Sequence, residues 1–274
     1  MTELVVYSDL DGTLLDHHDY SHAAADALLA ELEVKGIPLV PASSKTRAEL
    51  LPLRCELANR HPFIVENGAA VYIPRGYFRE QPRDSSVDGG YWRRSFTQPH
   101  NVWLALVHSS AEDFPSQFTA LSAMDTHEIA ALTGLDAAAA GNAAKREFGE
   151  PLWWRGSDSE RQRFIEVMHK NGARVLQGGR FLHVGGECDK GRALRWLQRL
   201  YAAECGGTAP LSIALGDGDN DAAMLEAADY AVIVRSPAHP PPRLSRRQRV
   251  QTSSACGPAG WDEGLRRLLS ALGK

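Results

Sequence analysis

The chain has 274 residues, of which 43% are hydrophobic and 23% charged, and its formal net charge is −4. This composition is typical of a folded protein and argues against disorder. The mildly acidic charge argues against a nucleic-acid-binding surface, and no apolar run approaches the about 18 residues of a membrane span. At about 150 residues per domain, the length predicts one large or two modest domains.

The N-terminus leads almost directly into a strand-like run, without a basic leader or a cleavage site. We therefore expect no secretory signal and a cytoplasmic protein. The four cysteines are scattered and form no Cys-x-x-Cys pair. We expect free thiols in a reducing compartment rather than disulfides or a zinc site.

The N-terminal segment alternates short apolar runs with helical patterns. We predict strands at 4–7, 37–40, 63–65 and 71–73, and helices at 21–32 and 46–59. Ser21 is a candidate N-cap, and Asn67-Gly68 is a turn signal between the last two strands. The β-α-β-α-β order predicts a parallel sheet with right-handed crossovers.

The alternation of short apolar runs with helical patterns stops near Pro82. Residues 82–100 are rich in Pro, Ser, Asp and Gly and predict a linker or an irregular excursion. After them we predict a strand at 102–108, a mostly helical region at 112–140, a strand at 152–154, a helix at 157–171 and a hairpin of 174–177 with 181–184. Ser157 opens that helix with a capping box. We interpret this segment as a separate α+β unit.

From Lys190 on, predicted helices and strands alternate again, as they do in the N-terminal segment. We predict helices at 191–203, 221–228 and 261–272, and strands at 212–215, 230–234 and 248–252. The simplest interpretation is an α/β fold with a doubly wound parallel-sheet core that is split by an inserted α+β domain. We therefore expect residues 1–82 and 186–274 to form the core and residues 83–185 to form the inserted domain.

Two acidic motifs each follow a predicted strand. They are Asp9-Leu10-Asp11-Gly12-Thr13 and Gly216-Asp217-Gly218-Asp219-Asn220-Asp221. Either motif alone is compatible with an ordinary turn, because Asp and Gly are common in turns. Open α/β sheets bind ligands at the carboxyl ends of their strands, so the two motifs together predict a site for a hard cation such as Mg²⁺. A Ca²⁺ loop is not expected, because no Glu stands at its twelfth position.

These motifs resemble those of the haloacid dehalogenase (HAD) superfamily of phosphatases. Ser43, after the second strand, matches the hydroxyl of a further family motif, and Lys190, at a helix start, matches the family's lysine. The resemblance implies that both bind phosphoryl oxygens. It also implies a Rossmann-like core with a C2-type cap between the two residues, which agrees with the insertion inferred from the alternation of helices and strands. Taken singly, Ser43 is better interpreted as a helix cap and Lys190 as a surface charge, and only the order of the motifs favours the functional roles.

The resemblance further implies that Asp9 is the nucleophile and forms an aspartyl-phosphate. A carboxylate is ionised at neutral pH and needs no base to activate it. Asp11 would give a proton to the leaving alcohol and then activate water. Mg²⁺ would be held by Asp9, the carbonyl of Asp11 and Asp217, with Asp221 supporting the metal shell directly or through water.

Longer segments resemble the mannosyl-3-phosphoglycerate phosphatase family, within the Cof-like branch that has a C2B cap. They are 43–49, 63–69, 146–151, 178–184 and 257–261. Gly149 departs from the family pattern, in which Ser precedes Glu-Pro. The resemblance implies hydrolysis of mannosyl-3-phosphoglycerate to mannosylglycerate, a compatible solute.

Such a substrate carries a phosphate, a carboxylate and sugar hydroxyls, which suit basic and polar side chains. The candidate substrate-binding residues are Ser44, Lys45, Arg47, Glu66, Asn67, Arg146, Glu150, Arg180 and His183. The three arginines are also compatible with solvated positions, and His183 with a structural role. Trp153-Trp154 favours cap core over a sugar-stacking platform, and the basic run at 243–249 favours a solvated loop edge.

We therefore expect a Mg²⁺-dependent phosphomonoester hydrolase, monomeric or homodimeric, that acts on a phosphorylated glycosyl-glycerate or sugar phosphate. We expect neither nucleic acid nor membrane as a partner. The alternatives are a glucosyl-3-phosphoglycerate, sucrose-phosphate or hexose-phosphate phosphatase, a phosphomutase, and a catalytically silent sugar-phosphate sensor. The complete set Asp9, Asp11, Lys190 and Asp217 argues against the silent sensor.

Overall fold

The computed structural model describes residues 2–178 and 181–274. Its backbone contacts group the chain into two compact units, the first formed by Met1–Ser44, Asn59–Arg94 and Asp189–Lys274, the second by Lys45–Ala58 and Ser95–Cys188. Residues 45–58 thus group with the inserted segment, and residues 83–94 with the core segments. The division expected from the sequence, at residues 82 and 186, stays a prediction. Arg180, in the predicted hairpin, lies outside the described residues.

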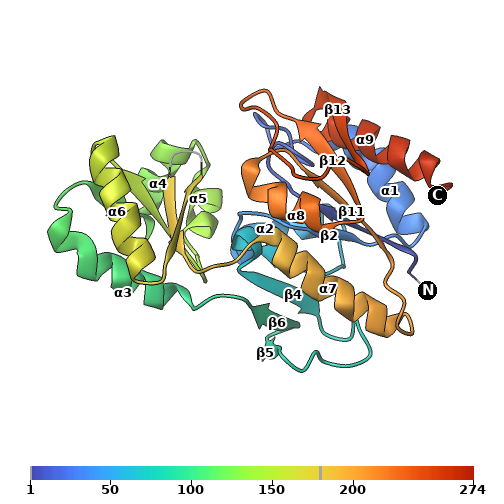
Figure 1. Cartoon of the computed structure of the whole chain (residues 1–274), viewed down its shortest axis with the longest axis horizontal. Helices are drawn as coiled ribbons and strands as arrows, with labels where there is room; N and C mark the ends of the chain where they lie inside the picture. The colour runs from blue at the N-terminus through green and yellow to red at the C-terminus, as the bar shows by residue number, and fades with distance from the viewer. Residues whose placement is uncertain (1, 179–180) are drawn as a thin grey trace. The chain divides into compact units, whose positions relative to one another are not determined.

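A five-stranded sheet in the order β13-β12-β11-β1-β2 forms the centre of the first unit (Figure 1). Its strands are β1 (Leu4–Ser8), β2 (Leu39–Pro41), β11 (Leu211–Gly216), β12 (Tyr230–Arg235) and β13 (Val250–Cys256). Every neighbouring pair is parallel. The predicted parallel core is confirmed, and its central strands are continuous apolar runs because helices cover both faces.

Two pairs of helices cover this sheet (Figure 1). They are α7 (Lys190–Glu204) with α8 (Ala222–Ala227), and α1 (Asp26–Val34) with α9 (Gly257–Ala271). Side chains of β1 pack against the helices on both faces of the sheet, because successive side chains of a strand point to opposite faces. Ser8 accepts a hydrogen bond from Trp261 of α9 at 2.9 Å, whereas Tyr7 is fully buried on the other face.

Helix α1 differs in detail from its prediction. The Ser21 hydroxyl accepts a hydrogen bond from the Ala23 backbone N–H at 3.3 Å, as a capping residue does. The chain then makes a 3₁₀ turn, η1 (Ala23–Ala25), before the α-helix begins at Asp26. The N-cap position of α1 is Ala25, so the predicted N-cap at Ser21 was wrong: a tight 3₁₀ turn, which is frequent at helix ends, separates Ser21 from the α-helix.

The first unit contains a second sheet in the order β3-β4-β6-β5. Its strands are β3 (Phe63–Val65), β4 (Ala70–Pro74), β5 (Ser86–Asp88) and β6 (Tyr91–Ser95). The turn predicted at Asn67-Gly68 joins β3 to β4, and the two strands pair in antiparallel fashion. Two other predictions were wrong here: the strand at 63–65 was expected in the parallel sheet and belongs to this second one, and residues 82–100 contain a hairpin instead of an irregular linker. A parallel bridge between Ala42 and Ile64 still connects the end of β2 to β3.

The second unit is built on the antiparallel sheet β7-β8-β10-β9. The strands are β7 (Phe118–Ala120), β8 (Glu150–Trp154), β9 (Arg174–Gly178) and β10 (Phe181–Gly185). The helices are α2 (Arg47–Glu56), α3 (His100–Ser110), α4 (Thr126–Thr133), α5 (Ala137–Ala143) and α6 (Asp158–Lys170). The antiparallel pairing of β9 with β10 and the capping box at Ser157 confirm two predictions.

Residues 102–108 were wrongly predicted as a strand and lie in α3. The buried residues of this helix, Trp103, Val107 and Ser110, recur every three to four positions, which is the helical period. The region 112–140 is helical only in part, because it also contains β7 and the 3₁₀ turns η3 (Ala111–Asp113) and η4 (Leu121–Ala123). Trp154 packs against the core of this unit and stacks on Phe118, as the core interpretation predicted.

The basic run at 243–249 is not simply a solvated edge. The Arg246 guanidinium donates hydrogen bonds to the carbonyl oxygens of Leu225, Ala228 and Asp229 at 2.7 to 2.8 Å. It therefore satisfies carbonyl oxygens at the end of α8 and directly after it, which have no partner within the helix. None of the four cysteines forms a disulfide. Over the described residues, every helix is too short or too polar to cross a membrane.

Candidate active site

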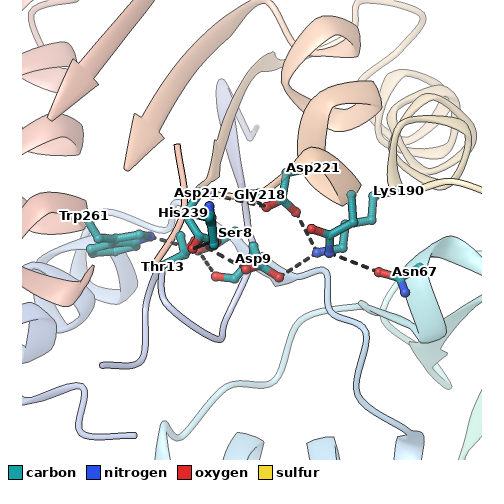
Figure 2. Close-up of polar contacts among 11 residues, drawn as sticks. Ser8, Asp9, Thr13, Asn67, Lys190, Asp217, Gly218, Asp221, His239 and Trp261 are labelled. Atoms are coloured by element: carbon teal, nitrogen blue, oxygen red, sulfur yellow. Dashed lines mark hydrogen bonds and ion pairs between the residues drawn. The ribbon is translucent and has the colours of Figure 1, made fainter. Parts of the chain in front are cut away.

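Three buried carboxylates converge at the carboxyl ends of β1 and β11 (Figure 2). Asp9 follows β1, Asp217 follows β11, and Asp221 ends the 3₁₀ turn η5 (Asp219–Asp221). Each offers an oxygen atom within 4.8 Å of the other two. The two strands are paired in parallel, so their carboxyl ends lie at the same edge of the sheet. The cluster has the oxygen-only donor set that divalent cations such as Mg²⁺ prefer, so its residues fit such an ion.

Lys190, the first residue of α7, lies between two of these carboxylates. Its Nζ donates to Asp9 Oδ1 at 2.6 Å and to Asp221 Oδ1 at 2.7 Å, and the side chain is fully buried. Burial alone would lower the pKa of Lys190, but the charges of Asp221 and Asp9 outweigh it and hold the pKa well above its ordinary value. The ammonium therefore stays charged and offsets part of the negative charge of the cluster.

Asp221 is held on both carboxylate oxygens. While Oδ1 accepts from Lys190, Oδ2 accepts from the backbone N–H groups of Asp217 and Gly218, each at 3.1 Å. These bonds fix the loop after β11 and orient the lysine. The role of Asp221 toward a metal ion, directly or through water, stays a prediction.

Asp217 faces side chains on both of its oxygens. Its Oδ1 accepts from the Thr13 hydroxyl at 3.1 Å, and its Oδ2 lies 3.2 Å from Nε2 of His239. Burial, followed by the negative charge of Asp9, raises the pKa of Asp217, and His239 opposes that shift. Gly12 is needed here, because its φ is +77° and an added Cβ would lie 2.6 Å from Asp217 Oδ2.

The nucleophile candidate Asp9 is fixed through its backbone as well. The Trp261 indole N–H donates to Ser8 Oγ at 2.9 Å, and that hydroxyl donates to the Asp9 carbonyl oxygen at 2.6 Å (Figure 2). All three residues are buried. The C-terminal helix α9 therefore holds the chain at the point where β1 ends.

Ser43 and Asn67 are connected through their backbones. Ser43 is fully buried after β2, and its carbonyl oxygen accepts from the Asn67 backbone N–H at 2.9 Å. The Asn67 side-chain oxygen accepts from Nδ2 of Asn220, in the loop after β11, at 3.2 Å. Asn67 thus links the end of β2 to the loop that carries the carboxylates.

The turn that carries Asn67 has an unusual backbone. Glu66, Asn67 and Gly68 have φ angles of +46°, +58° and +91°. A Cβ on Gly68 would lie 2.2 Å from the carbonyl oxygen of Asp189, so the turn packs directly against the start of α7. Left-handed conformation in residues other than glycine is costly, and such residues cluster at functional sites.

The other predicted residues of the first unit lie beside these. Asp11 is half-buried in the turn after β1, which the Gly12 N–H closes by bonding to the Leu15 carbonyl oxygen at 2.9 Å. Glu66 is buried, and Ser44 is half-buried after β2. The nine predicted residues in the described part of this unit are Asp9, Asp11, Ser43, Ser44, Glu66, Asn67, Lys190, Asp217 and Asp221.

The second unit carries the remaining predicted residues. Arg47 Nε pairs with Glu147 Oε1 at 2.8 Å. Lys45 and Arg146 are half-buried, and so is His183, which lies opposite Pro151 in the sheet. Arg180 belongs to the two internal positions outside the described residues. Substrate contacts by these five residues stay predictions.

Glu150 is the most enclosed of the predicted substrate-binding residues. Its Oε1 accepts from the Ser122 backbone N–H at 2.9 Å, and its Oε2 pairs with Nε2 of His100. The carboxylate is buried within the second unit, so both oxygens serve its internal structure. A direct contact of Glu150 with substrate stays a prediction.

Sequence reasoning missed several residues of the site. Thr13 belongs to the first acidic motif, so its position was available although its bridging role was not. Trp261 and Ser8 are far apart in sequence, and His239 lies in a proline-rich loop without a periodic pattern. Only the folded chain brings these three side chains to the carboxylates.

The chain matches the family model of haloacid dehalogenase-like hydrolases over residues 6–82. It is 33% identical over 265 residues to the glucosyl-3-phosphoglycerate/mannosyl-3-phosphoglycerate phosphatase of Methanococcoides burtonii, with 97% of each chain covered. Its fold resembles that of Thermoplasma acidophilum 0175 (TM-score 0.67, 14% identity, 100% and 99% of the two chains covered). It also resembles BT1666 from Bacteroides thetaiotaomicron, described among the HAD phosphatases (TM-score 0.65, 19% identity, 99% and 96% covered). The chain therefore belongs to the haloacid dehalogenase-like hydrolases and is a phosphatase of that family.

Proposed function

We propose that this phosphatase removes the phosphate of a glycosyl-3-phosphoglycerate, with mannosyl-3-phosphoglycerate as its main substrate and mannosylglycerate as its product. The observation that carries the proposal is the similarity to a phosphatase named for these substrates, which extends over both units. The polar and basic side chains of the second unit are compatible with the carboxylate and hydroxyl groups of such a molecule.

Asp9 is the proposed nucleophile. Its carboxylate attacks phosphorus, the bond between phosphorus and the glycerate oxygen breaks, and an aspartyl-phosphate forms. Asp11 gives a proton to the departing oxygen and then takes one from the water that hydrolyses the intermediate. Asp9 suits this role because Lys190 and the Ser8–Trp261 pair fix its side chain and its backbone.

Lys190 and Ser43 are proposed to bind the phosphoryl group. The Lys190 ammonium, 2.6 Å from Asp9, reduces the repulsion between an anionic nucleophile and an anionic phosphate. Ser43 offers a hydroxyl at the end of β2, next to the strand that carries Asp9.

The proposed cation is Mg²⁺, held by Asp9, the carbonyl oxygen of Asp11 and Asp217. When bound, it supplies charge neutralisation at the phosphoryl oxygens. The support is the buried, oxygen-only donor set. We expect EDTA to abolish phosphate release and added Mg²⁺ to restore it. Full activity in EDTA would contradict the proposed cation.

The substrate proposal is tested by measuring phosphate release from a panel of phosphate esters. The panel contains mannosyl- and glucosyl-3-phosphoglycerate, sucrose-6-phosphate and simple hexose phosphates. We expect the highest kcat/KM with mannosyl-3-phosphoglycerate. Hydrolysis of hexose phosphates alone would overturn the substrate class, and no release from any ester would overturn the catalytic proposal.

The role of Asp9 is tested with Asp9→Asn, which keeps the shape of the side chain but weakens its nucleophilicity. We expect turnover to fall below detection, while the circular dichroism spectrum stays that of the wild type. Normal turnover by this variant would exclude Asp9 as the nucleophile. The cytoplasmic location and the monomeric or homodimeric state stay predictions.

A further inference from the structure

His239 lies beside the carboxylate cluster, and no sequence motif predicts it. It lies in the segment between β12 and β13, and its side chain is 40% exposed. Nε2 of its ring lies 3.2 Å from Asp217 Oδ2 (Figure 2). Nδ1 lies 3.1 Å from the carbonyl oxygen of Pro240. Both ring nitrogens therefore face oxygen atoms of the first unit.

The three clustered carboxylates are supported in different ways. Asp221 is held by backbone N–H groups and the buried Lys190, and Asp9 by Lys190 and Thr13. Asp217 has the buried Thr13 on Oδ1, but an exposed side chain on Oδ2. Among these carboxylates, the orientation of Asp217 therefore depends most on a side chain at the surface.

The backbone around His239 suits a supporting role. Three consecutive prolines, Pro240 to Pro242, follow the histidine, and each fixes its own φ angle. A stiff segment loses less conformational entropy when it presents a side chain in one place.

We propose that His239 is a positioning residue for the cation site: its imidazole holds the Asp217 carboxylate from the solvent side and thereby raises the affinity of the cluster for a divalent cation. The inference rests on the proposed function, because it takes Asp217 as a ligand of the cation. A direct ligand role for His239 has less support, because the set of donors within 4.8 Å of one another that the described residues form consists of carboxylates. Outer partners of this kind typically change metal affinity by about 10- to 100-fold.

The test measures cation binding without any turnover. Mn²⁺ serves as the probe, because its free concentration can be followed by electron paramagnetic resonance in the absence of substrate. The proteins are the wild type, His239→Ala, His239→Gln and the control His127→Ala, which removes an exposed histidine of the second unit. Circular dichroism melting curves verify that all four proteins are folded.

We expect His239→Ala to bind Mn²⁺ about tenfold more weakly than the wild type, at the lower end of the usual range because the ring is partly exposed. His239→Gln retains an N–H group and should restore most of the affinity, and His127→Ala should match the wild type. In turnover assays, the Mg²⁺ concentration for half-maximal rate should rise in His239→Ala, with little change of kcat at saturating Mg²⁺.

Each contrary outcome has its own meaning. If the wild type binds no Mn²⁺, the proposed cation site itself is wrong and the inference falls with it. If the wild type binds Mn²⁺ and His239→Ala binds it equally well or more tightly, the positioning role alone is overturned. A loss of affinity in His239→Gln as large as in His239→Ala would also overturn it, because the amide N–H group would then have no effect.

Discussion

Lys190 shows how strongly one buried residue can depend on its neighbours. Its ammonium is enclosed between Asp9 and Asp221, and its removal leaves two carboxylates in a buried place with no cation between them. Breaking a buried ion pair by deleting one partner typically costs about 3–5 kcal/mol. We therefore expect Lys190→Met to lower the free energy of unfolding by about 3–5 kcal/mol, as measured by urea denaturation without added cation.

The matched control is Lys35→Met, which removes an exposed lysine at the end of α1. We expect the control to stay within about 0.5 kcal/mol of the wild type. Equal stability of Lys190→Met and the wild type would mean that the two carboxylates do not need the ammonium.

At the same scale, the sequence revealed the carboxylates and the lysine but not the residues that orient them. Asp9, Asp217 and Asp221 stand in short motifs after strands, so their convergence follows from the topology of a parallel sheet. Trp261 reaches Ser8 across the whole length of the chain, and His239 comes from an irregular loop. No local periodicity marks such contacts, because tertiary packing alone creates them.

At the scale of the element, the start of α6 was predicted from a chemical signal. The Ser157 hydroxyl accepts from the Glu160 backbone N–H at 3.3 Å, and the Glu160 carboxylate accepts from the Ser157 N–H at 2.7 Å. This reciprocal pairing satisfies N–H groups that a helix leaves open at its start. Helix α6 therefore begins where its prediction placed it.

We expect Ser157→Ala to destabilise the protein by about 1 kcal/mol, the usual cost of losing an N-cap. The measurement is the midpoint of chemical unfolding at constant slope. Ser109→Ala is the control, because that hydroxyl bonds back to the Leu106 carbonyl oxygen within α3 and caps no helix start. An equal loss in both variants would contradict the capping role.

The wrong strand at 102–108 has a physical explanation at this scale as well. A short apolar run cannot be assigned by hydrophobicity alone, because a buried helix and a buried strand both produce one. The turn between β3 and β4, in contrast, has a chemical signal in Asn67-Gly68. The backbone of Glu66–Gly68 is left-handed there, and the two strands pair in antiparallel fashion, as this turn signal predicts.

At the scale of the whole molecule, the chain order of the core was predictable, but the membership of α2 was not. Its N-cap Thr46 donates to the Asn142 carbonyl oxygen at 3.0 Å, and Arg47 pairs with Glu147 at 2.8 Å. Both partners belong to the inserted segment, so α2 groups with it although β2 precedes the helix directly. No pattern in the sequence near α2 indicates that this helix packs with a segment so distant in the chain.

The grouping of α2 with the second unit predicts what happens when residues 95–188 are removed from the chain. A shortened chain with residues 2–94 joined to residues 189–274 by a glycine-serine linker keeps α2 but loses α5, against which α2 packs. We expect it to bind the dye ANS and to unfold with a broad transition. Replacing residues 45–58 by a linker as well should restore a sharp transition. A sharp transition and no ANS binding in the first chain would contradict the grouping.

The central position of β1 has a consequence for biosynthesis. Leu4 of β1 pairs with Leu211 of β11, so β1 gains this neighbour only after the whole segment between the two strands has been made. Pairings between such distant residues form slowly, and an unpaired strand edge is prone to aggregation while it waits. The nascent chain therefore carries Asp9 long before Asp217 and Asp221 exist, and the carboxylate cluster can assemble only after the second acidic motif has been made.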